Sequence, residues 1–245
     1  MRSEERRRVL ESIRANVART GHHVTLVHGG RTPRFAYSIG LTERGLPEVV
    51  LAGATSLGGK AVKRALDEAV AASRSGGGSL AAGGAVEVPG VGAFEVGSVD
   101  PSWARRLLLG VRDYYDRDDP SALQLVPEGA VRTIDVPDMS RAWDPAREPV
   151  WRWLDDASDL PVAPDAVAVT NLDALRGSPI SEAARWEEDQ WEMFAGAGPD
   201  VPPDDVRVVP LATLLAFDPS LEPVTRLEVG RALRRDPPGP WESWG

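Results

Sequence analysis

Residues 35–42 read FAYSIGLT, and residues 47–51, shortly after them, read PEVVL. Both runs are rich in aromatic, aliphatic and β-branched residues, which favour the extended backbone of a β-strand. Residues 43–46 between them, ERGL, are typical of a short charged turn. The pattern predicts a β-hairpin in the middle of a sheet. No residue type or spacing within it indicates catalysis, so this stretch predicts a fold and not a reaction.

The residues around this hairpin predict a sheet with helices packed on it. Before it, apolar residues at helical spacing predict a helix over residues 4–19, and residues 23–28 predict a strand. After it, we expect a helix between Ser56 and Ser73, strands at 85–88 and 93–99, a helix opened by Asp100 and Pro101, and strands at 122–126 and 131–136. The order α-β-β-β-α-β-β-α-β-β is typical of an α+β domain with a mostly antiparallel sheet.

Residues 137–149 predict a linker. Three prolines interrupt this segment, and prolines are typical of connections between compact units. We therefore expect an α+β protein with two domains, residues 1–136 and residues 150–245. The second domain is expected to be a small α+β unit, with strands at 166–170, 190–196 and 206–209, a short helix at 211–217 and a last helix at 224–235.

The two halves of the chain differ in charge. Residues 1–140 hold 18 Lys and Arg against 17 Asp and Glu, a net charge of +1, whereas residues 141–245 hold 10 against 20, a net charge of −10. Residues 155–205 alone hold 13 acids and two bases. Such a field repels nucleic-acid phosphates and attracts basic proteins. We therefore expect a basic protein partner and no nucleic acid; the alternative is a solvated acidic surface that serves solubility alone.

The composition excludes several kinds of site. The chain has no cysteine, which rules out disulfides and thiolate chemistry. Residues 53–60, GATSLGGK, do not have the spacing of a phosphate-binding loop, and His22 and His23 are strand neighbours that point to opposite faces. We therefore expect no cofactor and no metal. The charged N-terminal helix and the lack of an apolar run long enough to span a bilayer predict a cytoplasmic protein without membrane contact.

Two groups of residues are candidates for binding. The candidate partner-binding face combines a tryptophan with a run of acids: Trp186, Glu187, Glu188, Asp189 and Glu192. Trp186 and Trp191 are the candidate anchors, although on an alternating strand Trp191 would face the core. Paired carboxylates for acid–base work or a hard cation are the alternative for this acidic run.

The second group is a candidate ligand pocket in the first half of the chain, formed by His28, Tyr37 and Thr42. We assign no catalytic residue, because the sequence offers no nucleophile with a base placed to activate it.

Four short strings in the first half carry a family resemblance: HVTLV at 23–27, FAYSIGLT at 35–42, PE at 47–48 and ALQLV at 122–126. Through them, roughly residues 8–135 resemble an uncharacterised bacterial family, domain of unknown function 4262. The resemblance implies the fold of that family and brings no activity with it.

A second set of strings lies in the other half: WEMFAG at 191–196, Asp205, Val206 and Val208 leading to LATLL at 211–215, FDPSL at 217–221 and RALRRD at 231–236. They are similar to the immunity protein 33 family, also called domain of unknown function 2185. That family is predicted to neutralise toxins in bacterial conflict systems, so the resemblance implies an immunity role.

These observations predict a non-enzymatic binding protein that docks a basic partner on its acidic second domain, with a toxin as the partner that the resemblance implies. The alternative is an enzyme or small-ligand-binding domain in the first half, with a pocket near Tyr37 and His28, regulated by the second half. The lack of an assembled nucleophile and base favours the first hypothesis.

Overall fold

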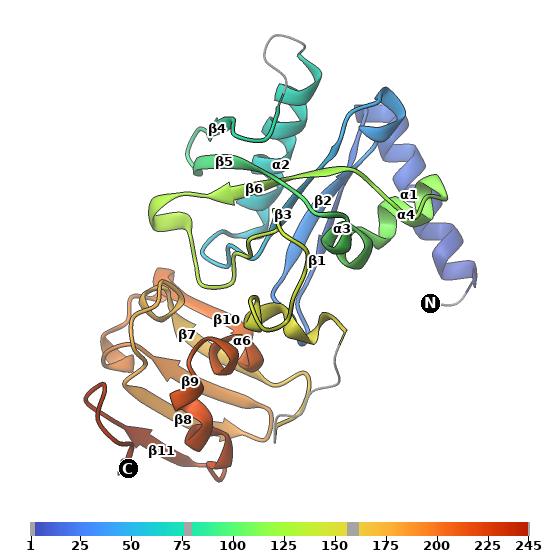
Figure 1. Ribbon diagram of the computed structural model, residues 1–245. Coiled ribbons are helices and arrows are strands. Elements are labelled where there is room, and N and C mark those ends of the chain that lie inside the picture. The colour runs from blue at the N-terminus through green and yellow to red at the C-terminus, as the bar shows by residue number, and fades with distance from the viewer. Residues whose placement is uncertain (1–2, 76–79, 156–161, 245) are drawn as a thin grey trace.

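The computed structural model describes residues 3–75, 80–155 and 162–244. It contains two separate six-stranded sheets, each packed with helices, which confirms an α+β protein of two domains. Figure 1 shows the sheet of the first half above that of the second half, with the connecting segment between them. Among the described residues, none of the helices combines the length and the apolar character needed to cross a bilayer.

The first sheet has the strand order β1-β2-β3-β6-β5-β4. Its strands are β1 (His23–Val27), β2 (Phe35–Ile39), β3 (Glu48–Ala52), β4 (Ala85–Val88), β5 (Gly92–Ser98) and β6 (Ala122–Pro127). Only the central pair, β3 and β6, is parallel, and the other neighbours are antiparallel. The expectation of a hairpin within a mostly antiparallel sheet is therefore confirmed.

Helices cover both faces of this sheet. On one face, α2 (Gly59–Arg74) packs against side chains such as Ala36 and Leu51. On the other face, α1 (Ser3–Thr20), α3 (Pro101–Leu107) and α4 (Leu109–Tyr115) pack around Tyr37 and Val50. Every residue of β2 and β3 is consequently buried, which explains why residues 35–42 and 47–51 are apolar nearly throughout instead of alternating.

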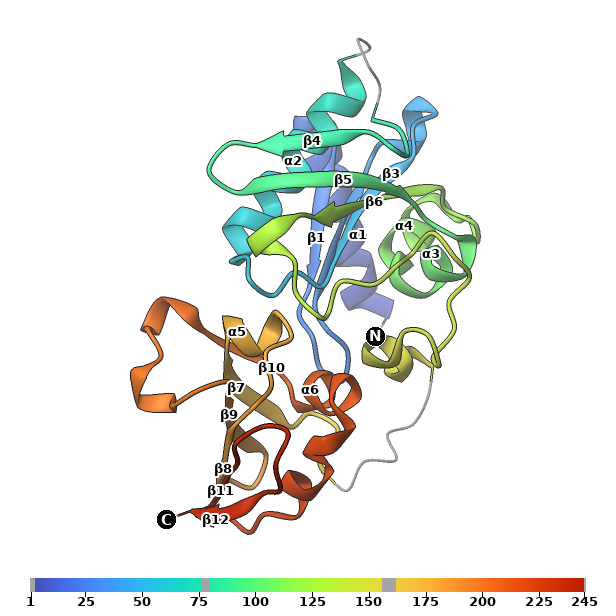
Figure 2. The same ribbon diagram turned by 60° about the vertical axis from the view of Figure 1, so that its left-hand side comes forward.

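The second sheet has the strand order β10-β7-β9-β8-β11-β12. Its strands are β7 (Val167–Asn171), β8 (Glu182–Glu187), β9 (Gln190–Phe194), β10 (Val206–Pro210), β11 (Arg231–Arg234) and β12 (Glu242–Trp244). The helices that contribute to its core are α5 (Leu172–Leu175), α6 (Leu211–Phe217) and the 3-10 helix η6 (Pro219–Arg226). Figure 2 shows this sheet nearly edge-on, with α6 against one of its faces.

The segment expected as a linker packs on the first half. The side chain of Met139 is fully buried, its carbonyl accepts a hydrogen bond from the Asp100 amide at 2.8 Å, and the Trp143 amide donates to Ser102 Oγ at 2.7 Å. The 3-10 helix η3 (Pro149–Leu154) follows it and contacts α6 of the second half. The domain boundaries themselves stay a prediction.

Several hydrogen bonds join the halves directly, including two that Arg176 donates to the Ala130 carbonyl. Arg207 of β10 donates from Nε to the Thr55 carbonyl at 3.2 Å and from Nη2 to the Ser56 carbonyl at 2.9 Å. The Ile134 amide donates to the Leu175 carbonyl at 2.7 Å. Because these bonds link backbone of one half to the other, they fix how the two sheets face each other.

Two predicted elements are wrong. Residues 131–136 form no strand, because the side chains of Thr133 and Asp135 turn inward and hydrogen-bond each other in a buried network. Residues 224–235 do not form the helix predicted for them: η6 ends at Arg226, Gly230 takes a left-handed φ of 81°, and β11 begins at Arg231. A helix cannot continue through that turn.

Candidate functional site

The most elaborate polar cluster of the first half surrounds Glu48, whose side chain is fully buried. Its Oε1 accepts hydrogen bonds from the amides of Gly40, Leu41 and Thr42 at 3.0–3.1 Å and from Thr42 Oγ1 at 3.0 Å. Its Oε2 accepts a bond from Ser38 Oγ at 2.5 Å. One carboxylate thus holds the chain where it leaves β2.

The position of this cluster follows from the pairing of β2 and β3. Their backbone register ends at Tyr37 opposite Val50. Beyond that point, Ser38 Oγ accepts the Val49 amide at 2.9 Å, and Glu48 takes the amides that no longer have a strand partner. Gly40 is required at the bend, because its φ is 128° and a Cβ would lie 2.9 Å from the Gly21 carbonyl oxygen.

Chemically, this arrangement favours a structural role for Glu48. The Tyr115 hydroxyl also donates to Oε1, at 3.3 Å. Burial, followed by the charges of Glu48 and Glu43, raises the pKa of Tyr115, which keeps this hydroxyl a donor. Both carboxylate oxygens are therefore occupied by donors from the chain itself, and neither is left to abstract a proton from a substrate.

The candidate ligand pocket of the first half is not assembled as one site. Tyr37 is buried, and its hydroxyl accepts the Gly110 amide at 3.0 Å. Thr42 borders a cavity of about 240 Å³ beside Tyr115. His28 borders a different cavity, of about 320 Å³, between the two halves. The structure does not bring these three residues together.

In the second half, α6 and η6 pack on one face of the sheet, and the opposite face carries only the short 3-10 helix η4 (Gly198–Asp200) among the described helices, where Gly198 lies against Phe194 and Glu182. Trp191, Met193 and Ala168 point into the core formed with α6 and η6. On the opposite face, directly paired residues form one continuous row across all six strands. We call this the open-face row; from β10 to β12 it consists of Val208, Val169, Glu192, Ala184, Ala232 and Trp244.

Sequence reasoning placed the two tryptophans of this region correctly. Trp191 is completely buried, with Arg185 stacked on its ring at 4.5 Å. Trp186 is 51% exposed, and its Nε1 donates to Glu192 Oε2 at 2.8 Å. Trp186 and Glu192 therefore stand together on the open face. The remaining candidates, Glu187, Glu188 and Asp189, are exposed at the turn between β8 and β9.

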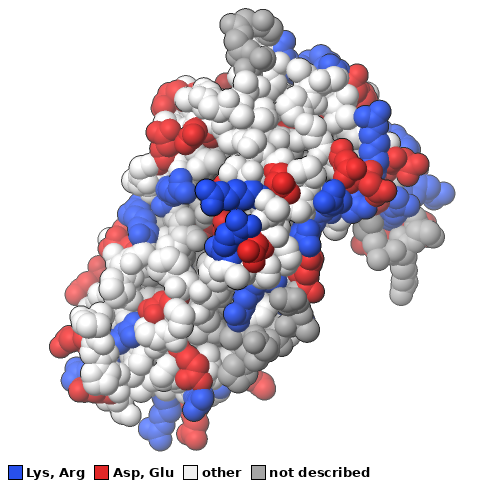
Figure 3. Space-filling view, in the orientation of Figure 1, with Lys and Arg blue, Asp and Glu red and all other residues white. Residues whose placement is uncertain are grey.

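Of the other described acids of the segment 155–205, Glu182 lies on the open face and the rest lie elsewhere. Asp165 borders the cavity between the halves, and Asp200, Asp204 and Asp205 lie in and beside the 3-10 helices η4 (Gly198–Asp200) and η5 (Pro203–Asp205). On the face drawn in Figure 3, acidic and basic side chains of the second half are interspersed. Residues 156–161 lie outside the described part of the chain. The local group around Trp186, and not the whole segment, is therefore the candidate site.

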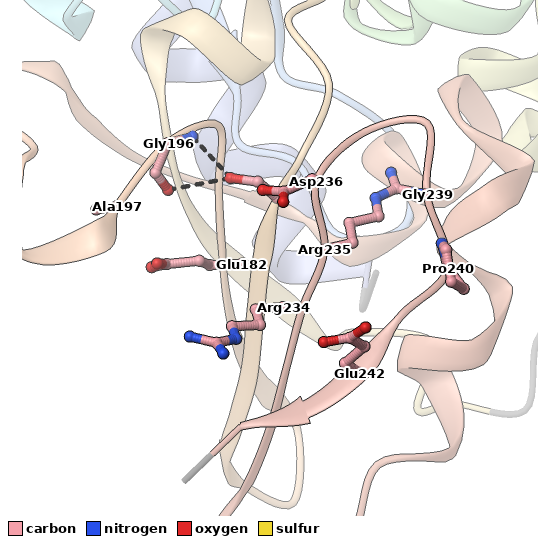
Figure 4. A pocket seen from close by; sticks show the side chains of 10 residues that line it. Glu182, Gly196, Ala197, Arg234, Arg235, Asp236, Gly239, Pro240 and Glu242 are labelled. Carbon is pink, nitrogen blue, oxygen red and sulfur yellow. Dashed lines mark hydrogen bonds between the residues drawn. The ribbon is translucent and has the colours of Figure 1, made fainter.

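A charged hollow of about 610 Å³ lies beside the open-face row. Glu182, Arg234 and Glu242 line it from directly paired positions on β8, β11 and β12, as Figure 4 shows. Arg235 borders the same hollow, but its guanidinium donates to the Ile180 carbonyl and stacks on Trp241. This hollow extends the polar rim of the open face. Sequence analysis missed it because β11 was predicted as helix.

Comparison with known proteins identifies one part of the chain. Residues 16–129 match the model of a family described as a domain of unknown function (DUF4262), so this part is a DUF4262 domain. No curated protein and no solved structure matched. Nothing in the comparisons identifies the second half, and its similarity to immunity protein 33 stays a prediction.

A substitution at Glu48 tests the structural role of its carboxylate. Glu48→Gln replaces one acceptor oxygen by a donor that faces chain amides or a hydroxyl, so we expect a loss of about 2–4 kcal/mol in the free energy of unfolding. Urea unfolding measures it. Glu43→Gln, an exposed change in the same turn, is the control and should cost less than about 1 kcal/mol. Equal stability of the two variants would contradict the structural role.

The two tryptophans allow a second test. Trp191→Ala opens a cavity in the core and should lower the free energy of unfolding by about 3–5 kcal/mol. Trp186→Ala removes an exposed ring and one hydrogen bond and should change it by less than about 1 kcal/mol. Urea unfolding of both variants checks this difference. A similar loss of unfolding free energy in both variants would mean that the Trp186 side chain is packed against other residues.

Proposed function

We propose that the chain is a non-enzymatic binding protein that docks a basic protein partner on the open face of its second sheet. The carrying observation is Trp186, an exposed tryptophan held by a hydrogen bond to Glu192 on the sheet face opposite α6 and η6. Tryptophan is enriched among the residues that dominate binding energy, especially when it is pre-ordered at the centre of a contact.

The remainder of this face has the character of a contact surface. Its row begins at Val208, which is 62% exposed, and ends at Trp244, which is 40% exposed. Between them, Ala232 is half-buried and Ala184 is buried. An apolar strip with a polar rim is the usual anatomy of a protein interface.

Charge favours a basic partner. The sheet residues on this face include the acids Glu182, Glu192 and Glu242 against one base, Arg234. The turn of Glu187, Glu188 and Asp189 adds three exposed carboxylates next to Trp186. Acids placed around an aromatic anchor steer a cationic partner during encounter, and this effect weakens as salt is added.

A toxin is the partner class that we propose to test first, because the second half is similar to the immunity protein 33 family. In that role, the open face would cover a basic surface of the toxin. The DUF4262 domain would hold the second sheet in place through Arg207 and the buried segment around Met139.

One observation favours a second candidate function, a ligand-binding protein in which both halves take part. The cavity that His28 borders is lined by residues of both halves. A ligand bound there would couple the first half to the second, as the alternative hypothesis requires.

The docking proposal is tested by affinity capture from the source cells, followed by rate measurements. Wild-type protein should capture a basic protein, and charge reversal of Glu187, Glu188 and Asp189 to Lys should slow its association at least about tenfold and flatten its salt dependence. Trp186→Ala should speed dissociation without unfolding the chain.

A matched control reverses three exposed acids of the first half, Glu87, Glu95 and Glu128, to Lys. This variant should associate at the wild-type rate. The proposal is wrong if no basic protein is captured, or if the acidic-turn variant and Trp186→Ala bind with unchanged rates and salt dependence.

A further inference from the structure

A cavity of about 320 Å³ lies where the two halves meet. The first half contributes the loop of His28, Gly29 and Gly30 together with Arg34 and Thr55, and the second half contributes Asp165, Val167 and residues 208–210. Its volume is at the lower end of the range for small-molecule sites. Neither half forms this cavity alone.

The wall from the first half is cationic. Arg34 uses Nη2 to donate to the carbonyls of Ala54 and Leu57, which fixes its guanidinium in place. Its Nε is buried and has no hydrogen-bond partner in the structure, an arrangement that native proteins usually avoid. Burial, opposed by the charge of Asp135 and reinforced by that of Arg207, lowers the pKa of Arg34, and the guanidinium remains a cation. His28 beside it is exposed and adds an imidazole.

The wall from the second half is of opposite character. Asp165 supplies an exposed carboxylate that forms no ion pair or hydrogen bond with the described residues. Val167, Val208 and Pro210 supply an apolar surface next to it. The cavity therefore presents a cation on one side, an anion on the other and an aliphatic patch between the halves.

We propose that this cavity binds a free α-amino acid with an aliphatic side chain. The α-carboxylate would pair with Arg34 and accept a hydrogen bond from His28, because a guanidinium favours carboxylates. The α-ammonium would pair with Asp165. The aliphatic side chain would cover Val167, Val208 and Pro210 and remove their apolar surface from water.

Such a ligand would touch both halves of the chain at once. The ligand would bind only when the two halves face each other as they do here. It would therefore stabilise this arrangement by mass action. Val208 also begins the open-face row, so an occupied cavity would shield the β10 end of that row. This inference does not rest on the docking of a protein partner.

The test is the thermal unfolding of the full chain with each of four probes: L-valine, L-leucine, L-isoleucine and L-methionine. At least one should raise Tm by about 3–6 °C at ten times its dissociation constant. For that amino acid, the N-acetylated form, which lacks the ammonium, and the amide, which lacks the carboxylate, should each bind at least about tenfold more weakly by isothermal titration calorimetry.

Variants assign the contacts. Asp165→Asn and His28→Ala should each weaken binding of the amino acid at least about fivefold, whereas Asp200→Asn, which also removes one exposed acid from the second half, should leave it unchanged. Arg34 stays intact in these variants because it also holds two backbone carbonyls. The proposal is overturned if none of the four probes raises Tm, if the N-acetylated form binds as tightly as the free amino acid, or if Asp165→Asn binds like wild type.

Discussion

The first half of this protein depends on a buried carboxylate that collects the amides of its own chain. Removing an ion from water without partners costs several kcal/mol, yet Glu48 is fully buried. Three backbone amides and three hydroxyl groups compensate this cost. The carboxylate lies where β2 and β3 stop pairing, so it allows the two strands to separate without leaving unpaired amides in the core.

This interaction explains the residues of the stretch 35–48, and the explanation requires no ligand. Ser38 bridges the Glu48 carboxylate and the Val49 amide, Gly40 supplies a backbone conformation that other residues rarely adopt, and Thr42 donates twice to Glu48. The polar residues of this stretch are therefore engaged in holding the fold. Groups free to bind lie elsewhere, on the open face of the second sheet and in the cavity between the halves.

The sequence allowed the strands of the first sheet and β7, β9 and β10 of the second to be predicted, because β2 and β3 are apolar on both faces and Trp191 alternates with Glu192. It did not indicate β8 or β12. The open-face row could not be predicted from the sequence, since it depends on the register of six strands. One of these strands, β11, lies in the segment 224–235, which the sequence pattern predicted to be a helix. Nothing in the sequence indicated that Tyr37 and His28 lie apart. Tyr37 points into the core of α3 and α4, whereas His28 lies beyond the end of β1.

Amide hydrogen exchange at Gly40, Leu41 and Thr42, followed by NMR, tests the account most directly. These amides belong to no strand ladder or α-helix, and their bonds to Glu48 should nevertheless protect them nearly as well as the core amides of β3, which open only by global unfolding. Exchange close to the rate of a free peptide would show that the carboxylate does not hold the chain, and the structural explanation of residues 35–48 would be wrong.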